Sequence, residues 1–372
     1  MAEPSSSPAA RPPETEAVTV REYGTRYLRI TVRHHADAGF SWLRSPGPAH
    51  TAPQRLPPAT VGAALRRVDT AAGNAVGTAA AGTRLALGER AADAGPDGAT
   101  RPDGTAAGPD PRPGVLYRVP GAFSVARLLP CGDDTAFRIS VDALAQLGRT
   151  LRRLHQEPWE LPERPPHLGV RRLSAWLSGE ENAPGASRLR TVARARLGAS
   201  LWTRLTDWSE AAGTPPAGGA VLLHGAPSTG WLVPSPAGGP TALLTGEEVT
   251  GGDPALDLGW ILGELHELRA AAARGLGSAG QGPPVDYPTA AHALLAGYTG
   301  GDGAAVPQGT ARAATLRLAV HMRDFASFVG WHEDLRHYCD LLAEALTEEG
   351  APCLRWGTHD AAPGRSVPAR LL

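Results

Sequence analysis

The feature of this sequence with the clearest chemical pattern is a short apolar run that leads into a histidine and a glycine. The run covers residues 221–223, and His224 and Gly225 follow it directly. Short apolar runs bounded by turn residues are typical of buried strands, and loops at strand ends commonly carry catalytic groups. The hydroxyl groups of Ser228 and Thr229 come next and could bind phosphate. The stretch therefore predicts a functional loop at a strand end.

Acidic residues follow this loop at two places. Thr245-Gly246 is followed by one acidic pair, and the segment 252–258 reads Gly-Asp-Pro-Ala-Leu-Asp-Leu, ahead of a helical pattern. The second aspartate of that segment is placed to cap the helix at its N-terminus. Carboxylates in such positions are candidate magnesium ligands and candidate acids or bases. These candidate residues are Glu247, Glu248, Asp253 and Asp257.

The stretch 221–258 resembles the aminoglycoside phosphotransferase and choline kinase family, a branch of the protein-kinase fold. Members carry a His-Gly-Asp loop that ends in a metal-binding asparagine, then a metal-binding aspartate, and then Gly-Asp-Pro-x-x-Asp-Leu. The segments 224–225 and 252–258 match this motif in sequence and spacing. The resemblance implies that His224 orders the loop through hydrogen bonds and that Asp253 accepts hydrogen bonds from its backbone.

The reactive positions of the motif do not match. Ala226 stands at the catalytic aspartate position, Trp231 at the metal-binding asparagine position and Thr245 at the metal-binding aspartate position. Phosphoryl transfer needs a carboxylate beside the acceptor hydroxyl and oxygen ligands for Mg²⁺. The chain also contains no lysine, so all 36 basic residues are arginine. An arginine could replace the family's phosphate-binding lysine only with a different geometry.

Two functional hypotheses follow from this mismatch. In the first, the chain is a degenerate member, a pseudokinase without ATP or magnesium, that binds a peptide or a partner protein. In the second, it is an active ATP- and magnesium-dependent phosphotransferase acting on a peptide Ser/Thr or a small-molecule hydroxyl. In that case the acids at positions 247, 248, 253 and 257 would replace the missing catalytic and metal-binding groups of the motif, and Glu247 or Glu248 would bind one cation. Trp231 fills the space of the missing metal and phosphate, or it faces outward as a partner contact.

The degenerate loop within an intact frame also resembles the phosphotransferase homologues of class V lanthipeptide and thioamitide clusters, which make ribosomal peptide natural products. That resemblance implies a role in dehydrating Ser and Thr of a precursor peptide, beside a lyase subunit.

Composition argues against several classes of protein: nucleic-acid-binding, disulfide-rich, exported and membrane-spanning proteins. The formal net charge of −1 argues against a nucleic-acid-binding protein, for which a basic excess is usual. Cys131, Cys339 and Cys353 fit neither a metal motif nor a disulfide framework, which favours a reducing, cytoplasmic location. We find no export signal and no apolar run of about 18 residues, so a membrane span is not expected.

The predicted fold class is α+β, a bilobal protein-kinase-like fold with a small, interrupted β-containing N-lobe and an α-rich C-lobe. Strands are expected at 28–33, 40–43 and 115–119. A first helix is expected after Pro57-Pro58, with Val61, Leu65 and Val68 on one face, and a looser Ala-rich segment continues it to about Leu87. Further helices are expected from an N-cap at Ser140 to His155 (a structural residue), and at 188–210, 258–273, 290–298, 311–329 and 334–347. The predicted division is a disordered tail 1–17, an N-lobe 18–130 with a flexible insertion 89–114, a C-lobe 131–350 containing the loop remnant 221–257, and a tail 351–372.

Overall fold

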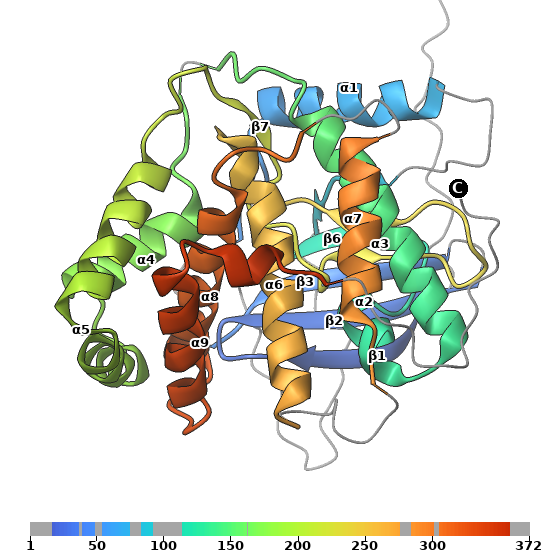
Figure 1. Ribbon diagram of the computed structural model, residues 1–372. Helices are drawn as coiled ribbons and strands as arrows, with labels where there is room; N and C mark the ends of the chain where they lie inside the picture. The colour runs from blue at the N-terminus through green and yellow to red at the C-terminus, as the bar shows by residue number, and fades with distance from the viewer. Residues whose placement is uncertain are drawn as a thin grey trace, which may run out of the picture.

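Helices and strands are both present in the computed structural model, which places the chain in the α+β class (Figure 1). The structure describes residues 17–36, 39–48, 54–74, 83–91, 114–161, 163–275, 284–300 and 305–357, the side chains of 70–74 excepted. The strands are β1 (Val18–Gly24), β2 (Leu28–His35), β3 (Gly39–Pro46), β4 (Arg84–Ala86), β5 (Glu89–Arg90), β6 (Val115–Val119), β7 (Val221–Leu223), β8 (Leu232–Val233), β9 (Ala242–Leu244) and β10 (Thr250–Gly252). The α-helices are α1 (Ala59–Asn74), α2 (Val125–Leu128), α3 (Asp134–Leu154), α4 (Leu168–Ser178), α5 (Pro184–Gly213), α6 (Pro254–Ala273), α7 (Tyr287–Thr299), α8 (Thr310–Phe328) and α9 (Leu335–Thr347), with 3₁₀ turns η1 (Leu129–Cys131) and η3 (Ala351–Leu354).

The largest sheet has five strands in the order β1-β2-β3-β6-β5, all antiparallel. The three central strands, β2, β3 and β6, alternate between a buried and a more exposed face, as a half-buried sheet requires. The buried side chains include Val32, Trp42 and Tyr117, which lie opposite one another in the strand register. The three strands expected from the sequence at 28–33, 40–43 and 115–119 are therefore confirmed.

Two small sheets position the His-Gly loop. Strands β7 and β10 pair antiparallel, so Val221–Leu223 lies beside Thr250–Gly252. Strand β9 pairs with β8 on one side and with β4, in parallel, on the other. Because β4 comes from the N-terminal half of the chain, this pairing ties the loop region to the sheet-containing part.

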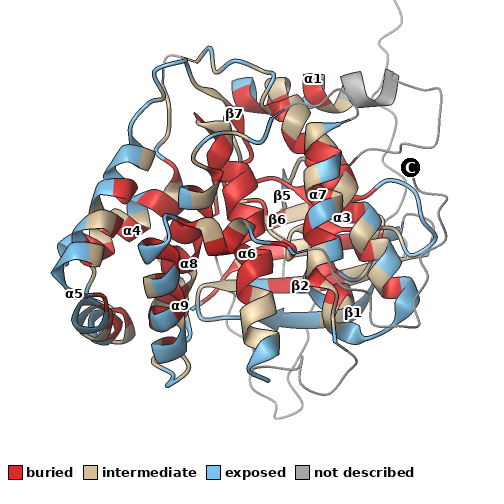
Figure 2. Ribbon diagram, in the orientation of Figure 1, coloured by how far each residue is buried: buried red, intermediate tan, exposed pale blue. Residues whose placement is uncertain are grey.

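Helix α6 is the central element of the helical part. It lies between α3 and α7 on one side and α4, α5, α8 and α9 on the other (Figure 1). All residues from Ala255 to Glu267 are buried, so the helix has no solvated face over this length (Figure 2). Glycines let the neighbouring backbones approach closely: a Cβ on Gly259 would lie 2.7 Å from the carbonyl oxygen of Thr310 in α8.

The helix α3 confirms the predicted apolar stripe but begins earlier than expected. Leu144, Leu147, Leu151 and Leu154 are all fully buried, and burial of one such side chain contributes roughly 1.5–3 kcal/mol. The N-cap is not Ser140, which lies inside the helix and donates its hydroxyl to the carbonyl of Ala136 at 2.7 Å. The cap is instead the side chain of Asp133, which accepts from the backbone N–H of Ala136 at 2.8 Å. A serine favours the N-cap position, but inside a helix it can also donate to the carbonyl four residues earlier, as Ser140 does, which explains the error.

The other expected helices are present, with boundaries shifted by a few residues. Helix α5 extends over 30 residues and bends at Gly198, whose φ of 69° and ψ of 176° are not helical. The C-terminal tail starts later than expected, because Ala351–Leu354 form η3 and Cys353 and Trp356 are buried. The predicted tail 1–17, apart from its last residue, and most of the predicted insertion 89–114 lie outside the described residues, although Glu89–Arg90 form β5. The division into two lobes stays a prediction.

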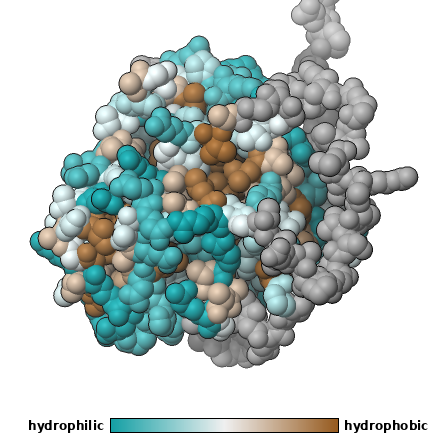
Figure 3. Space-filling view, viewed as in Figure 1, coloured by the Kyte–Doolittle hydropathy of each residue, from teal (hydrophilic) through white to brown (hydrophobic). Residues whose placement is uncertain are grey.

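The surface of the molecule is predominantly polar on the face seen in Figure 3, where apolar residues gather near the centre. Within the described ranges, no helix combines the length and the apolar character needed to cross a bilayer. All three cysteines are free thiols, and two of them, Cys339 and Cys353, are buried. The expectation of no disulfide framework is thus confirmed.

A buried histidine should make the stability of the protein depend on pH in the acid range. Burial lowers the pKa of His167 to about 4, and its Nδ1 accepts the backbone N–H of Val170 at the start of α4. Because the unfolded-state pKa is about 6.5, the unfolded chain binds the proton first as the pH falls. The contribution is therefore complete above about pH 6.5 and is lost toward pH 4. Between pH 7.5 and 4.5 the loss is about 2 to 3 kcal/mol.

The measurement is chemical denaturation at these two pH values for the wild type and for His167→Asn, which keeps an acceptor at the helix start. We expect the pH-dependent loss to be smaller in the variant by this amount. Equal losses in both proteins would contradict the assignment.

Candidate functional site

The His-Gly loop lies at the end of β7, and the ring of His224 forms hydrogen bonds with the loop backbone and with strand β9. The side chain is buried, and its Nδ1 accepts from the backbone N–H of Ala226 at 3.4 Å. The proton is therefore on Nε2, which donates to the carbonyl of Leu244 at 2.9 Å. The ring connects the loop to strand β9, the ordering role that the sequence resemblance implied for this residue.

Gly225 is required at its position by both backbone conformation and space. Its φ is 84°, in the left-handed region that favours glycine. A Cβ at this position would lie 1.8 Å from the carbonyl oxygen of Glu248. The loop backbone therefore packs directly against the segment 246–249.

A single buried carboxylate, that of Asp257, holds the loop backbone. It accepts from the N–H of His224 at 2.7 Å and from the N–H of Gly225 at 2.8 Å, and it lies 3.3 Å from His155 Nε2. Burial alone would raise the pKa of Asp257, but these donors lower it, with the hydrogen bond from His155 the largest of them. The other ring nitrogen of His155 lies 2.9 Å from the hydroxyl of Tyr298. His155 is thus the structural residue at a helix end that the sequence predicted.

The roles expected for the two aspartates of the segment 252–258 are exchanged in the structure. Asp253, predicted to accept from the loop backbone, is instead the N-cap of α6 and accepts from the N–H of Ala255 at 2.8 Å. Asp257, predicted to cap that helix, lies inside its first turn and points to the loop. Both are plausible caps by spacing, and Pro254 decides between them because proline favours the first position of a helix.

The hydroxyl groups of the loop are bound to a second buried carboxylate, that of Glu264 in α6. Ser228 Oγ donates to it at 3.1 Å, and Thr229 donates from both its hydroxyl, at 2.7 Å, and its N–H, at 3.0 Å. The predicted role of Ser228 and Thr229 in phosphate binding is therefore not supported. Their hydroxyl protons are already donated, and a nearby carboxylate repels an anion.

Two of the three substituted motif positions face the sheet. Thr245 is fully buried, donates its hydroxyl to the carbonyl of Ala86 at 3.1 Å, and accepts the hydroxyl of Tyr117 on its own carbonyl at 2.8 Å. Trp231 is half-buried and packs between the sheet core and the core of the helical part. Of the two positions predicted for Trp231, the inward one is observed.

An ion pair between Arg44 and Glu248 lies over the ring of Trp231. Arg44 Nη2 is 2.7 Å from Glu248 Oε1, and its guanidinium carbon is 4.4 Å from the ring centroid. Both side chains are largely buried, with 9% and 14% of their areas exposed. Burial alone would raise the pKa of Glu248, but Arg44 lowers it to about 2. Burial would likewise lower the pKa of Arg44, but Glu248 raises it.

The remaining candidate acid, Glu247, is half-buried next to this pair, and its charge raises the pKa values of Arg44 and Tyr117. The three buried carboxylates of the site, Glu248, Asp257 and Glu264, are bound by N–H, O–H and guanidinium donors. Within the described residues, no three His, Cys, Asp or Glu side chains form a group that could hold a metal ion.

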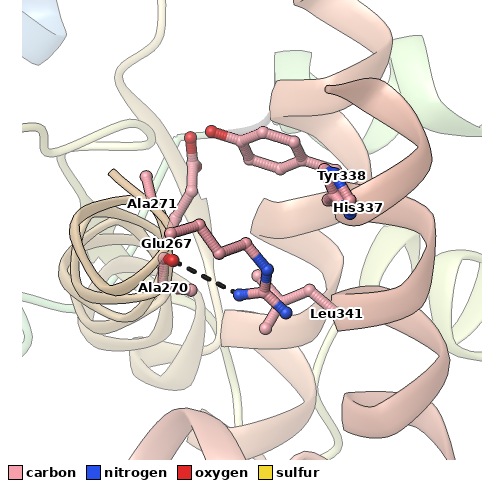
Figure 4. Close-up of a pocket in the computed structure, with 7 residues that line it drawn as sticks. Glu267, Ala270, Ala271, His337, Tyr338 and Leu341 are labelled. Atoms are coloured by element: carbon pink, nitrogen blue, oxygen red, sulfur yellow. Dashed lines mark hydrogen bonds between the residues drawn. The ribbon is translucent and has the colours of Figure 1, made fainter. Parts of the chain in front are cut away.

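A small surface pocket lies elsewhere, between α6 and α9 (Figure 4). It is lined by Glu267, Ala270, Ala271 and Arg274 from α6 and its C-cap, and by His337, Tyr338 and Leu341 from α9; Arg274 donates to the carbonyl of Ala270, one turn earlier. The carboxylate of Glu267 is paired with Arg317 at 3.3 Å and His321 at 3.1 Å. No residue of the His-Gly loop lines this pocket, so it is separate from the site.

Sequence reasoning missed Arg44 and Glu264. Each carried a signal: Arg44 occupies an inward position in the alternating strand 39–46, and Glu264 interrupts the apolar run 258–265. A charged residue at a core position is almost always paired. The sequence alone could therefore have predicted that Arg44 and Glu264 are buried and each bound to a polar or charged partner, although not which partner.

Comparisons with known proteins find similarity only at the level of structure. No protein-family model and no curated protein matches the sequence. Solved structures that match include an ethanolamine kinase from Plasmodium vivax, with 10% identity and a TM-score of 0.42, covering 89% of this chain and 81% of that one. An aminoglycoside phosphotransferase from Streptomyces rimosus matches with 16% identity and a TM-score of 0.40, covering 86% and 94%. A macrolide 2'-phosphotransferase from Brachybacterium faecium matches with 16% identity and a TM-score of 0.36, covering 89% and 90%. Similarities this distant assign neither a family nor an activity to the chain.

Proposed function

We propose that this chain is a phosphotransferase-like protein with a kinase-like fold that transfers no phosphate and serves as a peptide- or protein-binding subunit. The observation that carries the proposal is the buried Arg44–Glu248 pair over Trp231, at the place where the loop meets the sheet. In the family that the motif resembles, the metal is held by groups at the positions of Trp231 and Thr245. Here an indole and a fully buried threonine take those positions.

The frame of the loop supports the kinase-like part of the proposal. The histidine, the left-handed glycine and the buried aspartate of the motif form one hydrogen-bonded unit. This unit orders the loop and needs neither metal nor nucleotide. The finer proposal is a subunit of a Ser/Thr-dehydrating, lanthipeptide-type system in the cytoplasm, with a precursor peptide or a lyase subunit as the partner.

The active alternative requires displaced acids, and the structure weighs against three of the four. Glu248 is paired with Arg44, Asp253 caps α6, and Asp257 holds the loop backbone. A carboxylate that already accepts from protein donors has its anionic form stabilised and is a weaker base. Glu247 is the remaining acid of that hypothesis.

The test is a thermal shift measurement with ATP and Mg²⁺. We expect no change in melting temperature, because a ligand can raise the stability only by binding the native state. A bound ligand present at about one hundred times its Kd would stabilise the native state by about 2.7 kcal/mol. The melting temperature would then rise by several degrees. A shift of that size that disappears in Glu247→Gln would sink the proposal and favour the active alternative. A shift that persists in that variant would also contradict the proposed lack of nucleotide binding.

A further inference from the structure

Within the described residues, the outer edge of β1 is an unpaired sheet edge. Strand β1 is the terminal strand of the five-stranded sheet and, in the described part of the chain, pairs only with β2. All of its residues except Arg21 are exposed, as the pale blue strand in Figure 2 shows. The backbone N–H and C=O groups of such an edge can pair with another extended chain.

Apolar side chains are concentrated at this edge. Six large apolar side chains of the described residues are exposed, and four of them are Val18, Val20 and Tyr23 of β1 and Phe123, exposed by 61%, 48%, 41% and 46%; the other two are Val306 and Val329. Val20 is the extra residue of a bulge, because the register with β2 shifts between Thr19 and Arg21. From Arg21 to Gly24 the pairing is regular, so the bulge leaves a regular open segment.

The charge at the edge selects an acidic partner. The guanidinium of Arg21 lies between two rings, 5.1 Å from the centroid of Tyr23 and 5.5 Å from that of Phe123. It has no carboxylate partner within the described residues. Residues 18–35 hold four arginines and one glutamate, a formal charge of +3 with histidines neutral, whereas the whole chain carries −1. The hairpin of β1 and β2 is therefore a local basic surface on a nearly neutral protein.

We propose that an extended peptide segment with alternating apolar and acidic residues adds to the sheet along β1. Backbone hydrogen bonds to β1 supply affinity, an acidic side chain pairs with Arg21, and apolar side chains cover Tyr23 and Phe123. The inference rests on the proposed role as a peptide-binding subunit and names the surface that performs it.

The experiment selects binders from a phage-displayed library of random decapeptides, with the full-length chain as the target. Recovered peptides are synthesised with a fluorophore, and their Kd is measured by fluorescence anisotropy. We expect Asp or Glu between β-branched or aromatic residues, and no proline. Arg21→Glu should weaken binding at least about tenfold, since reversing a charge replaces an attraction with a repulsion. The matched control is Arg138→Glu, an exposed arginine on α3, which should leave the Kd unchanged.

Amide hydrogen exchange locates the bound peptide independently of these variants. Peptide addition should slow exchange at residues 18–24. Failure to recover binders, binding indifferent to Arg21→Glu, or protection elsewhere would overturn the proposal. A labelled single-stranded RNA that binds more tightly than any peptide and is released by Arg21→Glu would also overturn it, since the hairpin would then be a nucleic-acid surface.

This outcome is separable from that of the proposed function. The nucleotide test reports on the site of Arg44 and Trp231, and Arg44 lies on β3, two strands from β1. Nucleotide binding would sink the proposed function and leave peptide binding at the edge unaffected. A negative peptide selection would leave the lack of nucleotide binding intact.

Discussion

Replacing Asp257 with alanine should lower the free energy of unfolding by about 3 to 5 kcal/mol. The carboxylate is fully buried and accepts the N–H groups of His224 and Gly225 at 2.7 and 2.8 Å. Without it both donors stay buried and unsatisfied, and each such donor costs about 1 to 3 kcal/mol. The measurement is unfolding in guanidinium chloride.

Asp253→Ala is the matched control, because Asp253 belongs to the same motif and was the residue expected to hold the loop. Loss of an N-cap costs about 1 kcal/mol, so its effect should be much smaller. Amide exchange at His224 and Gly225 should accelerate in Asp257→Ala and not in Asp253→Ala. Equal destabilisation by the two variants, with equal exchange, would show that Asp257 does not hold the loop alone.

The sequence predicted the longest helices and three of the five strands of the large sheet, because their apolar residues recur at the period of the element; it did not predict β1, β5 or α4. The stripe of Leu144, Leu147, Leu151 and Leu154 is such a pattern, and all four are buried. Boundaries were less certain, since they depend on single side chains. Asp133 and Ser140 are both acceptable N-caps, and only the observed hydrogen bonds distinguish them.

The candidate site was located from sequence but its internal contacts were not. Its local motif survives as residues 224–225 and 252–258, because these residues shape a tight loop and a helix start. The partners of that loop are distant in sequence: Arg44 lies 204 positions from Glu248, and His155 lies 102 positions from Asp257. No periodicity or spacing connects such pairs, so these contacts could not be predicted from the sequence. Asp253 caps α6 instead of holding the loop, and phosphate binding by Ser228 and Thr229 is not supported, because both hydroxyl groups donate to Glu264.

The absence of lysine has a structural consequence at the site. An arginine presents a planar fork that can bind a carboxylate and stack on an aromatic ring at the same time, which an ammonium group does less well. Arg44 does both, with Glu248 and Trp231 as partners. The contact of Arg44, Glu248 and Trp231 is a largely buried unit.

A second large loss of stability is expected when only one partner of the Arg44–Glu248 ion pair is replaced. Glu248→Gln should destabilise the protein by about 3 to 5 kcal/mol, because the buried Arg44 loses its countercharge. Arg44→Met should cost a similar amount, since it leaves a buried carboxylate whose low pKa depends on the guanidinium.

The double variant Arg44→Met/Glu248→Met distinguishes two cases. In one the pair itself adds to the stability of the protein, and in the other each charge is needed only because its partner is buried. A buried ion pair can often be replaced by apolar side chains of similar volume with little loss, and a methionine retains packing against Trp231. We therefore expect the double variant to recover most of the stability lost in either single variant, as measured by denaturation in a double-mutant cycle. Single-variant losses below about 1 kcal/mol would indicate a solvated pair. Additive losses would mean that the two residues act independently. Either result would contradict the description of Arg44 and Glu248 as a buried, mutually dependent pair. The proposed function would then lose the observation that carries it.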